Sequence, residues 1–418
     1  MNTKAISNRI QTMAAVAGPI LQFVTDPQWE ERRKDPDVCD FMLGNPQDFP
    51  LQGLTAALQQ WAVPQNKDWF AYKMSEPRSQ EIIAAALRKS HGLPFEPADI
   101  LMTTGAFPGL SASLGAIIDP GDEIIYISPP WFFYGMMVAW HQGQPVRVQC
   151  DPATFDLDIS AIRRAITSKT RGIIINSPNN PTGRIYPPAT LRRLAEVLTE
   201  ASQDNQRPIY LLSDEAYSHI VFDNMTYPSP TAYYAHTFLI YTYGKTLLAP
   251  GQRMGYIALP PAMPDREIVR EGLVASLFAA GYTFPNALLQ HALGDLQKLS
   301  IDVRHLQAKR DRLANALRQM GYELKVPEGT FYLLVRSPLA DDMAFINMLA
   351  ELKILCLPGA VFEMPGYFRI SLTANDAMID RALPGFEQAI RLATLPAEKS
   401  PTRAAGALAE VNLLPARK

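Results

Sequence analysis

The sequence has few cysteines and no surplus of charge. Its 418 residues include three cysteines, Cys39, Cys150 and Cys356, which lie far apart and form no C-x-x-C pair or other metal-type spacing. This pattern argues against a disulfide framework and a structural zinc site, and it favours a reducing compartment. With 39 Lys and Arg against 41 Asp and Glu, the net charge is −2. Charge therefore gives no case for nucleic acid or a membrane surface as a partner.

Long hydrophobic runs are also absent. No stretch of about 18 uninterrupted apolar residues occurs, so the sequence predicts no membrane span. Residues 13–24 follow Lys4 and Arg9 like the apolar part of a secretion signal, but Gly18-Pro19 interrupts the run. Together with the cysteine pattern, this predicts a cytoplasmic protein.

Short apolar runs alternate with longer helix-like segments in the middle of the chain. The runs are 123–127, 172–176, 208–213, 238–243 and 255–259. Between them lie segments such as 189–203, in which Leu191, Leu194, Ala195 and Leu198 fall at the spacing of one helix face. This alternation is typical of βα units that build a mostly parallel sheet. After about residue 295 the chain reads as a long charged helix over 295–321 and then short strands, which indicates a second, smaller domain.

Three polar side chains come directly after these predicted strands. Asn180 lies in the turn SPNNPTG after one run, Asp214 ends the next, and Lys245 follows the run after that. Parallel α/β sheets bind ligands at the carboxyl ends of their strands. Each residue alone has an ordinary explanation as a turn residue, a helix cap or a solvated lysine. Together they predict one ligand site.

Lys245 stands in a Gly-Lys-Thr triplet, which also occurs in P-loops. A P-loop needs a glycine five residues before Gly244, because its backbone N–H groups must wrap the phosphates. That position is Leu239. The triplet therefore predicts no P-loop, and Lys245 needs a chemical role of its own.

The chain resembles the class I and II aminotransferases, fold-type I enzymes that use pyridoxal 5′-phosphate, from about Gly44 to Ala389. The motifs that carry the resemblance are Asn-Pro-Thr-Gly at 180–183, Asp-Glu-Ala-Tyr at 214–217, Lys245 followed eight residues later by Arg253, and Phe-Arg-Ile-Ser-Leu at 368–372. The resemblance implies an α/β fold, with a mostly parallel seven-stranded sheet flanked by helices in a large domain and a smaller α+β domain. The expected division is a large domain over 48–295, a small domain from 1–47 and 296–395, and a C-terminal tail over 396–418.

The resemblance also implies the catalytic residues. Lys245 would carry the cofactor covalently and move the proton at the substrate's α-carbon. Asp214 would keep the nitrogen of the pyridine ring protonated. Asn180 and Tyr217 would hydrogen-bond the ring oxygen of the cofactor and stabilise its ionised form.

The remaining cofactor contacts follow from the same resemblance. Gly105, Ala106 and Phe107 open a helix whose free N–H groups suit a phosphate. Arg253 would bind that phosphate with its planar fork, and Thr242 would add a hydroxyl. Trp131 would stack on the cofactor ring, with a place in the core as the alternative.

Three further residues would serve the substrate and the partner subunit. Arg369 resembles the clamp for the substrate's α-carboxylate, and Gly44 the glycine whose backbone lies over that carboxylate. Asn180 belongs to the same substrate site. Tyr72 matches a residue that reaches the phosphate in the neighbouring subunit, which implies a homodimer with shared sites.

The resulting expectation is an aminotransferase that moves an amino group from an L-amino acid to a 2-oxo acid by a ping-pong mechanism through pyridoxamine phosphate. A lyase or a cyclopropane-forming synthase on the same scaffold is the alternative, because one cofactor supports several reactions. A DNA-binding regulator built on this fold is disfavoured, since about forty residues precede Gly44 and show no helix-turn-helix pattern. Phe107 stands where some bacterial aspartate enzymes carry a lysine. The sequence therefore predicts an apolar or aromatic donor rather than aspartate.

Overall fold

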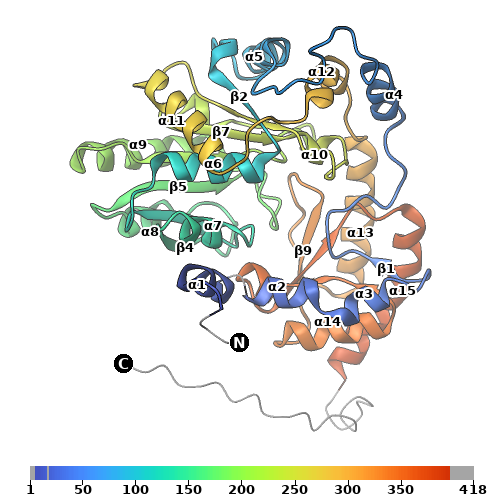
Figure 1. Cartoon of the computed structure of the whole chain (residues 1–418). Helices are drawn as coiled ribbons and strands as arrows, with labels where there is room; N and C mark the ends of the chain where they lie inside the picture. Colours follow the sequence, from blue (N-terminus) through green and yellow to red (C-terminus); the bar gives the residue numbers. More distant parts are fainter. Residues whose placement is uncertain (1–4, 17, 396–418) are drawn as a thin grey trace.

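The computed structural model describes residues 5–16 and 18–395 and has two parts (Figure 1). The sheet with its helices lies at the upper left of Figure 1, and β9 (Tyr332–Arg336) with the C-terminal helices lies below and to the right. The expected tail over 396–418 falls outside the described residues. The division at residues 47 and 295 stays a prediction.

The first part is built on a seven-stranded sheet with the strand order β2-β8-β7-β6-β5-β3-β4. The strands are β2 (Ile100–Thr103), β3 (Glu123–Ser128), β4 (Gln144–Gln149), β5 (Thr170–Asn176), β6 (Tyr210–Asp214), β7 (Thr237–Thr242) and β8 (Gly255–Ala258). β8 pairs antiparallel with both neighbours, and the other pairs are parallel. The α/β fold with a mostly parallel seven-stranded sheet is therefore confirmed.

Burial on both faces explains why these strands read as continuous apolar runs. In β5, Ile173 and Ile175 belong to the same hydrophobic cluster as Leu194 of α9 (Pro188–Asp204), on one face of the sheet. Ile174 belongs to the cluster of Leu110 in α6 (Ala106–Ile117), on the other face. All five predicted runs form strands, and β2 and β4 are two strands that the apolar pattern did not single out.

Helices cover the sheet and its edge by β2. Besides α6 and α9, they are α4 (Gln52–Trp61), α5 (Pro77–His91), α7 (Tyr134–Trp140), α8 (Ile159–Ala165), α10 (Tyr243–Thr246), α11 (Arg266–Ala279) and α12 (Ala287–Leu296). Along the part of the chain that the structure describes, no helix is both long and apolar enough to cross a membrane.

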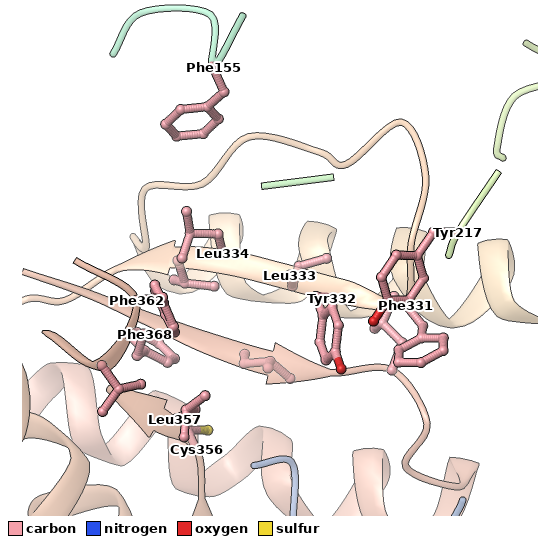
Figure 2. Packing of buried hydrophobic residues seen from close by; sticks show 14 of the residues in the cluster. Phe155, Tyr217, Phe331, Tyr332, Leu333, Leu334, Cys356, Leu357, Phe362 and Phe368 are labelled. Atoms are coloured by element: carbon pink, nitrogen blue, oxygen red, sulfur yellow. The ribbon is translucent and has the colours of Figure 1, made fainter. Parts of the chain in front are cut away.

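The second part combines the C-terminal quarter of the described chain with an N-terminal segment. Its three-stranded antiparallel sheet has the order β11-β12-β9. Its elements are α1 (Asn8–Val16), α2 (Gly18–Thr25), α3 (Pro27–Arg32), β1 (Cys39–Asp40), α13 (Val303–Met320), β9, α14 (Asp342–Glu351), β10 (Ile354–Leu355), β11 (Leu357–Pro358), β12 (Tyr367–Ser371) and α15 (Asp376–Thr394). β1 pairs in parallel with β10, while α1 packs against α7 of the first part. Figure 2 shows the apolar side chains that pack around β9.

The expected single helix over 295–321 is wrong at its start. α12 ends at Leu296, and α13 begins only at Val303. Asp302 caps α13, because its carboxylate accepts a 3.0 Å hydrogen bond from the backbone N–H of His305. The predicted end is correct, since Gly321 follows the helix with a φ of 100°, a conformation that favours glycine.

Candidate active site

A cavity of about 200 Å³ lies at the carboxyl ends of β5, β6 and β7. Its wall combines charged, polar and aromatic side chains from several elements. The lining residues are Ala106, Phe107, Leu110, Trp131, Asn176, Asn180, Asp214, Ala216, Tyr217, Thr242, Gly244, Lys245, Pro250 and Arg253. Most of the site residues predicted from sequence therefore meet in one cavity, as the ends of neighbouring parallel strands require.

Asp214 is held in a defined position at the end of β6. It is buried, and its Oδ2 accepts a 2.6 Å hydrogen bond from the Tyr134 hydroxyl. Its Oδ1 accepts a 3.2 Å bond from the N–H of Ala216, and its backbone oxygen accepts one from Asn176 Nδ2 at 2.9 Å. Each carboxylate oxygen therefore has a donor, and the side chain cannot rotate freely.

Burial raises the pKa of Asp214 above the usual carboxyl value of 3.8. The hydrogen bonds from Tyr134 and Ala216 and the charge of Lys245 act in the opposite direction, and Glu215 adds to the rise. A buried carboxylate without a cation in contact is costly. Asp214 is therefore suited to a positively charged or N–H-bearing ring in the cavity.

Lys245 lies in α10 directly after β7 and lines the cavity. Its Nζ lies 5.6 Å from the ring centroid of Tyr217 and 5.7 Å from that of Phe331. At these distances the amine lies near both rings. The amine thus faces the cavity together with the Tyr217 phenol.

The opposite end of the cavity is built for an anion. Gly105 precedes α6 with a φ of 103°, and a Cβ there would come within 2.9 Å of Nη2 of Arg253. Only glycine suits both the backbone conformation and this close approach. The first N–H groups of a helix lack acceptors within the helix, so the start of α6 at Ala106 and the Arg253 guanidinium form one positive surface. Thr242 adds its hydroxyl, which also accepts from the N–H of Gly244.

Aromatic rings form the outer wall. Phe107 stacks on Phe133 with centroids 5.3 Å apart and a tilt of 19°. Trp131 meets both rings edge-on, at 4.9 Å from Phe107 and 5.1 Å from Phe133. All three side chains are half-buried. The wall is therefore apolar at the position where the sequence suggested an apolar substrate.

Arg369 in β12 is joined to the cavity through Asn180. Its Nη1 donates to Asn180 Oδ1 at 2.8 Å, and its Nη2 donates to the carbonyl of Met42 at 2.9 Å. The guanidinium is buried, and its Nε–H has no partner within the described residues. A buried cation with an unused donor suits a carboxylate ligand. Gly44 lies beside Phe331 and Tyr332, where a Cβ would come within 2.6 Å of the Phe331 ring.

Tyr72 lies apart from the cavity of its own chain. Its side chain is 85% exposed and contacts Phe284, with ring centroids 4.7 Å apart. Its predicted role requires a neighbouring subunit, so the position at the surface is compatible with that role. The assignment stays a prediction.

Sequence reasoning missed three residues of this region. Tyr134 bonds Asp214, Asn176 accepts the backbone N–H of Asn180 at 2.7 Å, and Tyr332 lies against Arg369. Asn176 ends a predicted strand, as Asp214 does, so its position was a usable signal. Tyr134 and Tyr332 carry no comparable local signal, because both reach the site only through tertiary packing.

Comparison with known proteins agrees with this geometry. The model of the family "Aminotransferase class I and II" matches residues 36–386. A probable aspartate/prephenate aminotransferase of Thermus aquaticus is 30% identical over 399 residues, which cover 93% of this chain and 100% of that protein.

Solved structures are similar over the same length. An amino transferase from Eubacterium rectale has a TM-score of 0.82 at 29% identity, covering 94% of this chain and 97% of the other. The aspartate aminotransferase of Thermus thermophilus with maleate has a TM-score of 0.78 at 27% identity, covering 92% and 99%. The chain therefore belongs to the class I and II aminotransferases.

Proposed function

We propose that this aminotransferase uses pyridoxal 5′-phosphate and moves an amino group from an L-amino acid to a 2-oxo acid by a ping-pong mechanism. The observation that carries the proposal is one cavity that joins a lysine, a buried carboxylate and a positive helix start with its arginine. When bound, the cofactor would act as the electron sink for the substrate's α-carbon.

The residues present fit this cofactor. Asp214, held by Tyr134, would face the ring nitrogen, and its raised pKa signals a carboxylate that lacks a cationic partner. Arg253 and the start of α6 would hold the phosphate, because both offer N–H donors to an anion. Lys245 would carry the cofactor and transfer the proton at the α-carbon. Tyr217 and Asn180 would hydrogen-bond the ring oxygen.

The substrate would be held by its carboxylate. Arg369 offers the unpartnered Nε–H noted above, and a planar guanidinium binds a carboxylate through two donors. Asn180 and the Met42 carbonyl already fix the orientation of the guanidinium. Little ordering of Arg369 would then be required when the substrate binds.

An apolar or aromatic donor is the substrate class we favour. The relatives' names mention aspartate and prephenate, and aspartate needs a second cation for its side-chain carboxylate. The cavity wall instead carries Phe107 and Trp131, and Phe133 stacks on Phe107. Such a wall stabilises apolar groups and leaves a second carboxylate unpaired.

A homodimer is the assembly that we propose. Three large aromatic side chains are more than half exposed: Phe70, Tyr72 and Phe278. The ring of Phe284 contacts both Tyr72 and Phe278. Exposed aromatic surface of this kind is typical of an interface. Sedimentation analysis of the wild type and of the Tyr72→Ser and Phe278→Ser variants measures the oligomeric state. A wild type that sediments as a monomer would contradict the proposed homodimer.

Two successive half-reactions test the proposed activity. The cofactor-loaded enzyme is first converted with leucine or phenylalanine, excess substrate is removed, and a 2-oxo acid is added. One equivalent of new amino acid for each site is the expected result. The lyase alternative is tested with a donor that carries a leaving group on its β-carbon, such as cysteine. Release of that group with ammonia and pyruvate, and no new amino acid, would establish the lyase alternative.

A further inference from the structure

Tyr332 lies between the substrate clamp and the cofactor side of the cavity. It is buried at the start of β9, and the guanidinium carbon of Arg369 lies 3.9 Å from the centroid of its ring. In the pairing of β9 with β12, Arg369 stands opposite Leu334, two residues beyond Tyr332. The two side chains therefore share one face as diagonal neighbours, and the ring supports the flat side of the guanidinium.

The hydroxyl of Tyr332 points to the other partner. It is a hydrogen-bond partner of Tyr217, whose ring lies 6.0 Å away at 72°. Figure 2 shows Tyr217, Phe331 and Tyr332 together at one end of β9. Tyr217 faces Lys245 across the cavity. One side chain thus touches both the clamp and a phenol of the cofactor site.

The charges around Tyr332 agree with this position. Burial acts to raise the pKa of Tyr332, but the cations Arg369 and Lys245 and the hydrogen bond with Tyr217 bring it below the usual phenol value of 10.0. Burial raises the pKa of Tyr217 well above that value, and its bond to Tyr332 adds to the rise. Both directions agree with a hydrogen bond in which Tyr217 donates and Tyr332 accepts.

The position of Tyr332 is also sterically restricted. A Cβ on Gly44 would come within 2.5 Å of the Tyr332 hydroxyl and 2.6 Å of the Phe331 ring. Only a glycine at position 44 leaves room for this hydroxyl. The backbone of residues 42–44 therefore holds the clamp, through the Met42 carbonyl, and confines Tyr332 at the same time.

We propose that Tyr332 is a positioning residue that couples the carboxylate clamp Arg369 to the phenol of Tyr217. Its ring orients the clamp, and its oxygen competes with the cofactor for the proton that Tyr217 donates. The coupling rests on the proposed function, because it assigns Tyr217 to the ring oxygen of pyridoxal phosphate.

Two substitutions separate the two parts of the side chain. Tyr332→Phe keeps the ring and removes the hydroxyl, so the half-saturation concentration of the donor is expected to change less than about twofold. The visible absorbance of the bound cofactor is expected to titrate at a lower pH, because Tyr217 then donates to the cofactor alone. Tyr332→Leu also removes the ring, and the half-saturation concentration is expected to rise about three- to thirtyfold, the usual range for a lost cation–π contact.

Tyr322→Phe is the matched control, because it removes a buried hydroxyl of the second part that donates 2.8 Å to the Phe386 carbonyl. The role of the hydroxyl would be overturned if the cofactor of Tyr332→Phe titrated at the same pH as in the wild type or at a higher pH. It would also be overturned if Tyr322→Phe showed the same shift as Tyr332→Phe. Unchanged half-saturation in Tyr332→Leu would overturn the role of the ring.

A titration of tyrosine ionisation in the cofactor-free protein tests the pair independently. The tyrosine that ionises at the lowest pH in the wild type is expected to be missing from Tyr332→Phe and retained in Tyr322→Phe. Equal titrations would overturn the effect of Arg369 and Lys245 on the pKa of Tyr332. Failure of the proposed function has a different signature, since the wild type would then bind no pyridoxal phosphate.

Discussion

The Tyr134 hydroxyl donates a 2.6 Å hydrogen bond to Oδ2 of Asp214, across 80 residues of chain. Tyr134 is buried in α7, and Asp214 ends β6. Burial raises the pKa of the Asp214 carboxyl, and this bond counteracts the rise. The tyrosine therefore helps to keep the carboxylate ionised in a buried site.

Tyr134→Phe is expected to weaken cofactor binding and turnover together. A hydrogen bond to a charged group contributes about 1.5–3 kcal/mol, and its loss leaves Asp214 easier to protonate. The measurements are the dissociation constant of pyridoxal phosphate and kcat. Tyr234→Phe is the control, because its buried hydroxyl donates to the Ile209 carbonyl, away from the site. Equal cofactor affinity in the two variants would refute the role of Tyr134.

Asp214→Asn is expected to stabilise the cofactor-free protein at neutral pH. The folded-state pKa of Asp214 lies above the usual 3.8, so its contribution to stability is complete below that value and is lost as the pH rises through the folded pKa. Asparagine does not ionise, so Asp214→Asn avoids this loss of stability. The loss amounts to about 1.4 kcal/mol for each tenfold difference in the carboxylate's proton affinity between the folded and unfolded chain. Denaturant unfolding at intervals of about one pH unit, from roughly pH 3 to pH 8, shows whether the difference grows with pH.

A control of opposite sign is available. The indole N–H of Trp61 hydrogen-bonds Asp295 and lowers its pKa. The stability that the Asp295 carboxylate contributes is present above the usual carboxyl pKa, and it is lost as the pH falls through the lowered pKa. Asp295→Asn is therefore expected to be less stable at neutral pH. A cofactor-free Asp214→Asn protein that behaves in the same way would disprove the prediction.

Borohydride reduction of the loaded enzyme is expected to fix the cofactor on Lys245. The amine faces the cavity between the rings of Tyr217 and Phe331, and it lies at the end of β7 beside Asp214. Peptide mapping identifies the labelled lysine. Lys298→Ala, which removes an exposed lysine, is expected to keep the label, whereas Lys245→Ala is expected to lose it and all turnover. A label on another lysine would reject the assignment.

Arg369→Ala is expected to leave the cofactor bound and to weaken the donor by about 2–5 kcal/mol, the usual loss when one partner of a buried charge pair is removed. The measurement is half-saturation in the first half-reaction together with cofactor content. Arg253→Ala is the matched contrast, since that guanidinium lies at the start of α6 beside Gly105. This variant is expected to lose cofactor on dialysis. Both assignments fail if the two variants show the same pattern.

Phe107→Lys is expected to shift preference from leucine toward aspartate. The new ammonium would stand in the aromatic wall next to Trp131 and could pair with a side-chain carboxylate, an effect of about 1.5–3 kcal/mol. Rates of the half-reaction with both donors give the ratio. Phe107→Leu is the control, because it changes the ring without adding charge. Faster conversion of aspartate than of leucine by the wild type would contradict the proposed substrate class.

Local sequence patterns were sufficient for five of the seven strands of the large sheet and for part of the site. The apolar runs predict strands because both faces of a parallel sheet are buried, and Asn180, Asp214 and Lys245 follow from their places at strand ends. Phe107 and Arg253 needed the family motifs. Neither spacing nor periodicity shows that Gly105, at the start of a helix, meets an arginine 148 positions later in the chain.

Tertiary structure alone decided the rest. The break between Leu296 and Val303 depends on a cap by Asp302, which a periodic charged pattern conceals. Tyr134 and Tyr332 reach the site through the packing of α7 and through the pairing of β9 with β12. The role of each tyrosine depends on a residue that is far away in sequence and only a few ångströms away in space. Sequence periodicity specifies the buried face of an element, whereas strand order and packing decide what that face contacts.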